Sequence, residues 1–334
     1  MARERQIWGL VLAAGDGNRL RALTTPPCGA AVPKQFCSLH GGPALIEDAL
    51  DRAAALVAQQ RICTIVAHHH QQWWSGIERV RRLQPGNVIV QPRNCGTAIG
   101  VLYSLLHIVA KDADAFLALL PADHYVREEQ TLLRSLDAAL RRLREDASRP
   151  VLLGMEPDES DTDLGYILPG EPDALGGQNV MRFVEKPDLS AATEIINQGG
   201  LWNSFIIAAS AQSLLELFLP RYAPIVMEMQ VILSRALAAG SLAVGWPTIV
   251  DMYARLPNLD FSRDVLEGVE KRLSVVRVPP CGWSDLGTPR RVGQTLRRLR
   301  PRRAAEELPT PYINLAAQHA QYGRGSGSRI ADSG

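Results

Sequence analysis

The first apolar segment of the chain runs directly into a loop with two glycines and an arginine. In GLVLAAGDGNRL (residues 9–20), Gly15 and Gly17 precede Arg19. Small residues let backbone N–H groups approach phosphate oxygens, and an arginine adds a planar fork of donors. A dinucleotide site would require a third glycine where Leu20 stands, and a P-loop would require Gly-Lys-Ser/Thr close behind. We therefore interpret the loop as a site for the phosphates of a nucleoside triphosphate, with a plain strand-to-helix turn as the alternative.

A lysine follows this loop in a chain that otherwise uses arginine for positive charge. Only four of the 36 basic residues are lysines, namely Lys34, Lys111, Lys186 and Lys271. The first of them lies in the short motif PKQF (residues 33–36). A compact ammonium suits a single phosphate oxygen better than a planar guanidinium does. We interpret Lys34 as a ligand of the α-phosphate, and a solvated surface lysine is the alternative.

These residues need a scaffold that brings them together, and the N-terminal half predicts one. Apolar segments typical of strands occupy residues 7–13, 62–67, 87–91, 115–120 and 150–155, and helical patterns occupy residues 43–58, 96–110 and 130–145. This alternation predicts an α/β fold with a Rossmann-like, mostly parallel sheet flanked by helices. Such sheets bind ligands at the carboxyl ends of their strands, so residues 14–16, 91–97 and 121–124 should share one rim.

The second half of the chain has a looser pattern. We expect short strands in GYIL, VMRFVE and LWNSFIIA, two helices near residues 210–239, a strand at 274–278 and a helix at 288–300. We divide the chain into an α/β core (residues 1–225), a C-terminal part that completes the site (226–300) and a flexible tail (301–334). The tail is assigned because its sequence is rich in Gly, Ser and Arg.

Several motifs follow one another in a fixed order. After the glycine loop and PKQF come QPRNCGTAIGV (91–101), LLPADHYV (119–126), LGYILPGE (164–171), FVEKPD (183–188), LWNSFI (201–206), LDFSRDVLE (259–267) and GWSDLG (282–287). Over residues 7–295 this series resembles the sugar-phosphate nucleotidyltransferases, and more narrowly the mannose-1-phosphate guanylyltransferases. The resemblance implies the nucleotide-diphospho-sugar transferase fold with a small C-terminal extension. It also implies transfer of a nucleotidyl group, with GTP and mannose 1-phosphate as the expected substrates and pyrophosphate as the by-product.

The resemblance assigns the catalytic residues as Arg19, Lys34, Asp123 and Asp285, the two aspartates being also the ligands of Mg²⁺. Magnesium takes oxygen ligands from one or two carboxylates and from phosphates. It would assist in-line attack on the α-phosphate, a reaction that depends on positioning and charge. Asp123 follows the strand expected at 115–120, where a ligand can reach the rim, and a helix N-cap is its alternative. A turn aspartate is the alternative for Asp285.

Two further sets of residues form the expected substrate pockets. The nucleotide-binding set is Ala14, Gly15, Gly17, Asn18, Gln91, Asn94, Gly96 and Thr97. The sugar-phosphate set implied by the resemblance is Gly165, Tyr166, Glu185, Lys186 and Asn203. A helix cap is the alternative for Asn94 and Thr97, and core packing is the alternative for Tyr166.

The chain departs from the family pattern at several positions. Ala14 and Asn18 stand where the family has glycine and threonine, the stretch between Arg19 and Lys34 is a few residues longer, and Phe205 replaces the glycine of WNSG. Two other functions therefore stay open. One is a thymidylyl or uridylyl transferase acting on glucose 1-phosphate, and the other is a catalytically quiet paralogue that binds a sugar nucleotide.

Two other clusters are weaker candidates. The run His68-His69-His70 ends a predicted strand, and adjacent side chains point in different directions, so we expect a solvated loop rather than a metal site. The arginines Arg297, Arg298, Arg300, Arg302 and Arg303 could touch nucleic acid, but Glu306 and Glu307 follow them. We expect a solvated helix end there.

Composition sets the remaining expectations. The formal net charge is +1, no apolar run is long enough to span a bilayer, and the N-terminus lacks the apolar core of a signal peptide. We therefore expect a cytoplasmic enzyme without nucleic-acid or membrane partners, which could form a homodimer. The five cysteines are scattered without a Cys-x-x-Cys pair, so we expect neither disulfides nor a structural zinc site.

Overall fold

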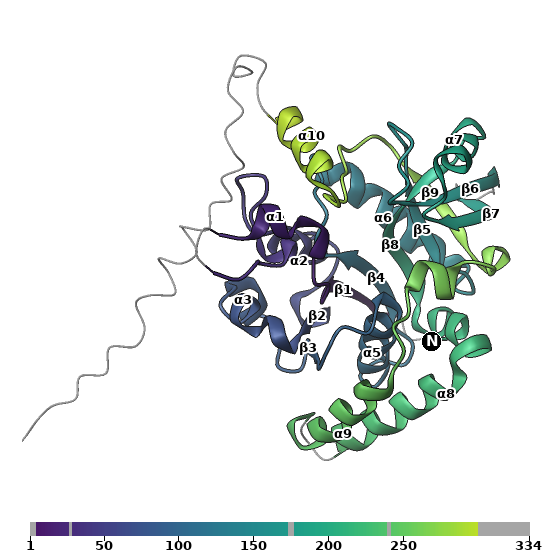
Figure 1. Cartoon of the computed structure of the whole chain (residues 1–334). Coiled ribbons are helices and arrows are strands. Elements are labelled where there is room, and N and C mark those ends of the chain that lie inside the picture. Colours follow the sequence, from purple (N-terminus) through teal and green to yellow (C-terminus); the bar gives the residue numbers. More distant parts are fainter. Residues whose placement is uncertain (1–4, 27–28, 173–176, 239–241, 300–334) are drawn as a thin grey trace, which may run out of the picture.

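The structure is a computed structural model that describes residues 5–26, 29–172, 177–238 and 242–299. Within these residues, nine strands form one sheet in the order β3-β2-β1-β4-β8-β5-β9-β7-β6 (Figure 1). The strands are β1 (Ile7–Ala13), β2 (Ile62–Ala67), β3 (Val88–Gln91), β4 (Phe116–Pro121), β5 (Val151–Met155), β6 (Gly165–Pro172), β7 (Gln178–Glu185), β8 (Leu201–Ser210) and β9 (Ser274–Val278).

The sheet is parallel in its first part and mixed in its second. Strand β1 pairs in parallel with β2 and β4, and β2 pairs in parallel with β3. Strand β8 runs antiparallel to β4, β5 and β6, and β7 runs antiparallel to β6 and β9. The α/β class is confirmed. The parallel pairing predicted by the alternating pattern covers β1 to β4, and the later strands pair antiparallel except for β5 with β9.

Helices cover both faces of this sheet. The longer helices are α2 (Leu45–Ala54), α5 (Thr97–Val109), α6 (Glu129–Glu145), α7 (Leu189–Asn197), α8 (Ala211–Ala238), α9 (Leu242–Arg255) and α10 (Pro289–Leu299), and the short ones are α1 (Arg21–Thr24), α3 (Gln71–Trp74) and α4 (Glu78–Arg81). Along β4, Phe116 and Leu120 point into the core under α2 and α6, whereas Leu117 and Leu119 point into the core under α5 and α8. Burial on both faces explains the continuous apolar strands.

The region after β8 differs from the sequence-based expectation. The two helices expected near residues 210–239 are present as the two halves of α8, which are separated by a kink at Tyr222 between Pro220 and Pro224. The additional helix α9 follows and packs against α8 (Figure 1). It was not expected because Pro247 lies inside it.

Strand β9 lies inside the sheet, between β5 and β7, although it comes late in the sequence. It pairs in parallel with β5 on one side and antiparallel with β7 on the other. The chain then passes to Asp285 and α10, and an antiparallel bridge between Ser284 and Tyr125 ties this segment to the loop after β4. The tail at 301–334 lies outside the described residues.

Two expectations about the whole chain can be compared with the described residues. No helix in these residues is long and apolar enough to cross a membrane. Cys37, Cys63, Cys95 and Cys281 are buried and free, and Cys28 lies outside the described residues.

Candidate active site

The carboxyl ends of β1, β3 and β4 open into a cavity of about 690 Å³. Residues from the second half of the chain close its other side, including the ends of β7 and β8 and the segment after α9. The predicted site residues that line the cavity are Ala14, Gly15, Arg19, Lys34, Gln91, Asn94, Gly96, Thr97, Asp123, Gly165, Glu185, Lys186, Asn203 and Asp285. One cavity therefore holds members of the catalytic, nucleotide-binding and sugar-phosphate sets.

Three predicted residues do not line this cavity. Gly17 has a φ of 62°, and a Cβ there would lie 3.1 Å from the backbone nitrogen of Lys34, so this glycine lets two segments approach each other. Asn18 begins a short 3₁₀ turn. Tyr166 is fully buried, and its hydroxyl accepts from Asp161 N at 2.8 Å and donates to Asp161 O at 3.0 Å. Tyr166 is therefore a core residue behind the cavity, which agrees with the alternative of core packing given for it above.

Lys34 links the two predicted metal ligands. Its Nζ lies 3.1 Å from Oδ2 of Asp123 and donates to the backbone oxygen of Asp285 at 2.7 Å. The lysine is only 7% exposed, so its charge sits in a place where an unpaired ammonium would be costly. Burial raises the pKa of Asp123, but the nearby ammonium of Lys34 outweighs this and holds that pKa below its ordinary value. The Asp123 carboxylate is therefore ionised at neutral pH.

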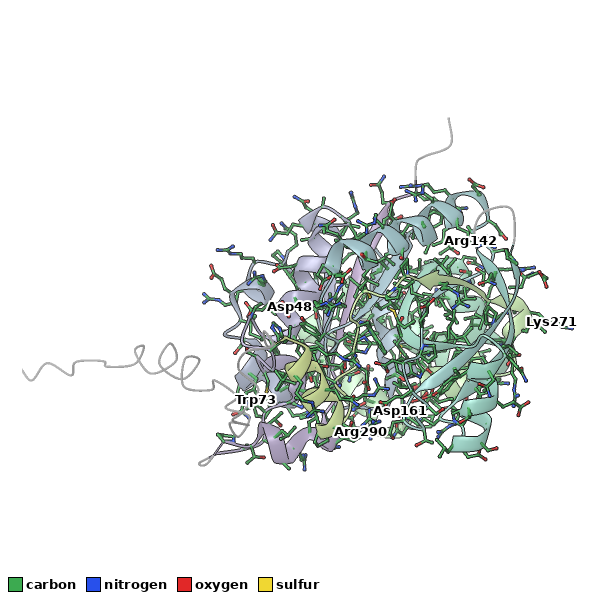
Figure 2. All side chains as sticks on the ribbon, turned by 90° about the horizontal axis from the view of Figure 1, so that it is seen from above. Asp48, Trp73, Arg142, Asp161, Lys271 and Arg290 are labelled. Atoms are coloured by element: carbon green, nitrogen blue, oxygen red, sulfur yellow. The ribbon has the colours of Figure 1, made fainter. Side chains whose placement is uncertain are left out.

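The Asp285 side chain is buried and has an orphaned oxygen. Among the described residues its Oδ1 has no hydrogen-bond partner, and the nearest cation is Nε of Arg291 at 3.5 Å. Arg291 is itself held by Asp161 at 2.8 Å and lies over the ring of Trp202. The neighbouring Arg290 also approaches Asp161, as Figure 2 shows. Two carboxylates, one of them with an unsatisfied oxygen, are a donor set that fits a hard divalent cation such as Mg²⁺.

The nucleotide side of the cavity combines one unpartnered group with several anchored ones. Gln91 lines the cavity and is 1% exposed. Within the described residues, its Oε1 has no hydrogen-bond partner. Asn94 Oδ1 accepts from Gly96 N at 2.9 Å, and Thr97 Oγ1 accepts from Phe261 N at 2.8 Å. Asn94 thus bonds to Gly96, the residue that precedes α5, whereas Thr97 bonds to Phe261 and does not cap its own helix. Both residues line the cavity.

The opposite wall carries the predicted sugar-phosphate residues. Lys186 Nζ lies 3.4 Å from Glu185 Oε1, and its side chain is 40% exposed. Burial and the nearby charge of Asp260 raise the pKa of Glu185. Gly165 makes room for this carboxylate, since a Cβ at that position would lie 2.5 Å from Glu185 Oε2. A cation accessible to a ligand and a carboxylate suited to hydroxyl groups thus stand side by side.

Strained backbone conformations occur near the cavity. In the part of the chain that the structure describes, three residues other than glycine have positive φ: Lys186 (52°), Phe205 (57°) and Leu286 (48°). Asn203 Oδ1 accepts from Phe205 N at 3.1 Å, which supports the strained turn. Each such conformation costs on the order of 1–3 kcal/mol, and strain of this kind clusters at functional sites. The glycine-to-phenylalanine departure in WNSF therefore falls on a position whose backbone favours glycine.

Several cavity residues received no role from the sequence. They are Asp163, His124, Trp283 and the group Asn258, Asp260, Ser262, Arg263 and Asp264. Asp163 Oδ1 lies 3.5 Å from the guanidinium of Arg19, and this ion pair connects the phosphate loop with the segment before β6. Asp260, Ser262, Arg263 and Asp264 belong to the motif LDFSRDVLE. The place of this motif in the ordered series was the sequence signal that could have identified them as site residues.

The expectation of a solvated loop at the histidine run is wrong for His70. This residue is 3% exposed, and its ring packs against Phe36 and Trp73. The run forms a 3₁₀ turn after β2, which brings His69 and His70 to Asp16 of the phosphate loop. Burial lowers the pKa of His70 to about 4, so its ring is neutral at neutral pH.

The arginine cluster lies mostly beyond the described part of the chain. Arg298 pairs with Asp158 at 2.7 Å on α10, and both side chains are more than a third exposed. Arg300, Arg302 and Arg303 lie outside the described residues.

Comparison with known sequences identifies related proteins. Curated relatives include the alginate biosynthesis protein AlgA of Pseudomonas fluorescens, 29% identical over 284 residues that cover 83% of this chain and 56% of the relative. The mannose-1-phosphate guanylyltransferase of Salmonella muenchen is 28% identical over 287 residues, covering 84% of this chain and 57% of that protein. The chain thus spans a little over half the length of these relatives.

Solved structures share the fold. A protein described as mannose-1-phosphate geranyltransferase from Thermus thermophilus matches with a TM-score of 0.68 and 29% identity, over 84% of this chain and 76% of that one. A UDP-glucose pyrophosphorylase complexed with UDP-glucose matches with a TM-score of 0.53 and 14% identity, over 88% and 98% of the two chains. A family model described as nucleotidyl transferase matches residues 8–298. With most of its length covered by that model, the chain belongs to the nucleotidyl transferase family.

Proposed function

We propose that this protein joins GTP to mannose 1-phosphate and produces GDP-mannose and pyrophosphate. The observation that carries the proposal is one cavity with three functional regions. The glycine loop and Arg19 lie at one side, Lys34 with Asp123 and Asp285 lies between, and Glu185 with Lys186 lies at the other side. This arrangement suits two phosphorylated substrates that meet over a pair of carboxylates.

The reaction is an in-line displacement. A phosphate oxygen of the sugar 1-phosphate attacks the α-phosphorus, a new P–O bond forms, and the bond to the β-phosphate oxygen breaks as pyrophosphate leaves. Lys186 holds the sugar phosphate, and Arg19 holds the β- and γ-phosphates. Lys34 keeps Asp123 ionised and fixes it against the backbone of Asp285.

Asp123 and Asp285 would hold Mg²⁺ through carboxylate oxygens. When bound, the ion would neutralise charge on the α-phosphate and on the leaving pyrophosphate. The orphaned Oδ1 of Asp285 supports this assignment, because a buried carboxylate oxygen without a hydrogen bond gains most from a cation.

The nucleobase and the sugar are selected by different walls. Gln91 offers a buried amide to the edge of a base, and the backbone at Gly96 permits close approach. A relative named mannose-1-phosphate guanylyltransferase supports GTP and mannose 1-phosphate as the substrates in this proposal. The alternative is a thymidylyl or uridylyl transferase acting on glucose 1-phosphate, which would require different contacts at these walls.

A substrate panel tests the proposal. We expect pyrophosphate release to be fastest with GTP and mannose 1-phosphate when four nucleoside triphosphates are combined with several sugar 1-phosphates. Fastest release with dTTP or UTP and glucose 1-phosphate would instead establish the alternative transferase. Sugar-nucleotide binding without pyrophosphate release from any pair would identify a catalytically quiet paralogue.

A further inference from the structure

The phosphate loop meets the turn after β2 through three potential metal ligands. Asp16 Oδ1 lies 3.0 Å from His69 Nε2 and 3.5 Å from His70 Nε2. Each residue offers one ligand atom, and these three atoms all lie within 4.8 Å of one another. Among the described residues, this is the group of three histidine, cysteine or acidic residues placed to hold a metal ion.

The spacing matches that of a tetrahedral metal site. Zinc binds histidine nitrogen and carboxylate oxygen at about 2.0–2.1 Å. Two ligands at that distance and at the tetrahedral angle lie about 3.4 Å apart by the same bond lengths. The two oxygen-to-nitrogen distances bracket this value, and the ligand atoms of His69 and His70 lie within 4.8 Å of each other.

The ligand atoms are also held in place by their surroundings. Asn94 Nδ2 donates to the second oxygen of Asp16 at 3.1 Å, which orients the carboxylate. The buried ring of His70 is fixed between Phe36 and Trp73 (labelled in Figure 2). A second interaction that orients a ligand is typical of metal sites and raises their affinity.

We propose that Asp16, His69 and His70 form a binding site for a divalent transition metal, with Zn²⁺ as the best fit. The ligand set of two imidazoles and one carboxylate suits zinc and other transition metals better than it suits magnesium. Three protein ligands leave one of four positions open for an oxygen ligand. The site is separate from Asp123 and Asp285, and the proposal stands whether or not the chain transfers a guanylyl group.

Such an ion would join two segments that the sequence separates. Asp16 adjoins Gly15, which lines the cavity, while the histidines belong to the turn between β2 and α3. Metal binding would therefore fix the phosphate loop against the sheet edge near β3, where Asn94 already contacts it. The expected result is a more ordered loop and a higher melting temperature.

Metal binding can be measured directly on the untagged full chain. After treatment with a chelator, the protein is dialysed against Zn²⁺ in excess Mg²⁺, so that the carboxylate pair is occupied by the harder ion. We expect one equivalent of zinc by elemental analysis and a tetrahedral visible spectrum when Co²⁺ replaces zinc. No retained zinc, or a cobalt spectrum that stays octahedral, would overturn the proposal.

Matched variants separate a built site from adventitious binding by a histidine run. Asp16→Asn and His70→Asn should weaken zinc binding at least about tenfold, since even the loss of an orienting partner costs that much. His68→Asn is the control, because the His68 ring packs near Trp246 and lies outside the cluster. If His70→Asn fails to fold, His69→Asn replaces it, as the His69 side chain is 49% exposed. Equal weakening in His68→Asn and in the ligand variants would overturn the site.

Discussion

Asp123 and Asp285 come from segments 162 positions apart, yet one lysine contacts both of them. Because each carboxylate is placed to bind the ion that neutralises the reacting phosphates, Asp123→Asn or Asp285→Asn should lower turnover by on the order of a hundredfold or more. Pyrophosphate release at saturating Mg²⁺ checks this. Turnover close to that of the unchanged protein in Asp285→Asn would remove that residue from the metal site.

The two cavity lysines should have different kinetic roles. Lys186 is accessible and stands beside Glu185, so Lys186→Ala should mainly raise the KM for the sugar 1-phosphate. Lys34 is buried and paired with Asp123, so Lys34→Ala should mainly lower kcat, with less effect on nucleotide affinity. Steady-state kinetics with each substrate varied separates the two effects.

Lys271 offers a matched control for these lysine variants. It lies on the exposed surface, as Figure 2 shows, and has no place in the cavity. Lys271→Ala should keep the kinetics of the unchanged protein. Equal effects of Lys34→Ala and Lys186→Ala on both substrates would contradict the proposed division of roles.

At the scale of elements, the start of α5 depends on a glycine. Gly96 has φ 87° and ψ 166°, a region essentially restricted to glycine, and a Cβ there would lie 2.1 Å from the backbone oxygen of Leu259. Gly96→Ala should therefore lower the free energy of unfolding by at least about 2 kcal/mol.

Chemical denaturation measures this loss against a suitable control. Gly15 lies in the phosphate loop, and no atom lies within 4 Å of a Cβ built on it. Gly15→Ala should leave stability nearly unchanged. A Gly96→Ala protein as stable as Gly15→Ala would show that the contact with Leu259 is easily rearranged.

The sequence predicted the parallel pairing of strands better than the antiparallel pairing. Strands such as β1 and β4 are buried on both faces, so their apolar runs stand out, and the rim residues that follow them were placed correctly. Strand β8 was expected from LWNSFIIA, but its antiparallel pairing with β4, β5 and β6 depends on partners far along the chain, which a local pattern cannot reveal. Proline within α9 also masked its helical pattern.

The same limit explains what the sequence missed in the site. Motifs indicated most residues of the cavity, because they lie at the ends of predicted strands. The link from Lys34 to the backbone of Asp285 and the approach of His70 to Asp16 are long-range contacts. Adjacent histidines predict a solvated turn unless an aromatic pocket buries one of them, and Phe36 and Trp73 supply that pocket only in the folded chain.

For the whole molecule, buried histidines predict a loss of stability in acid. His107 lies on α5, is 2% exposed and has Nδ1 2.7 Å from the carbonyl of Tyr103. Burial lowers its pKa to about 4. Between pH 6.5 and 4 the unfolded chain therefore binds a proton that the folded chain does not, so stability falls as the pH falls.

This effect can be isolated with one variant. By linkage, His107 alone accounts for about 2 kcal/mol of the loss between pH 7 and pH 5. Free energies of unfolding measured at both values should show a smaller loss, by about that amount, in His107→Gln. An unchanged pH dependence in the variant would show that other groups dominate.

The position of β9 between β5 and β7 has a consequence for the biosynthesis of the protein. About 120 residues separate the end of β5 at Met155 from the start of β9 at Ser274. At about 5–20 residues per second, a ribosome needs roughly 6–24 s to make that stretch. During this time β5 lacks one neighbour in the sheet, and exposed strand edges of this kind favour aggregation. The nascent chain therefore has most reason to engage a chaperone during this interval, and Asp285 is synthesised only after β9.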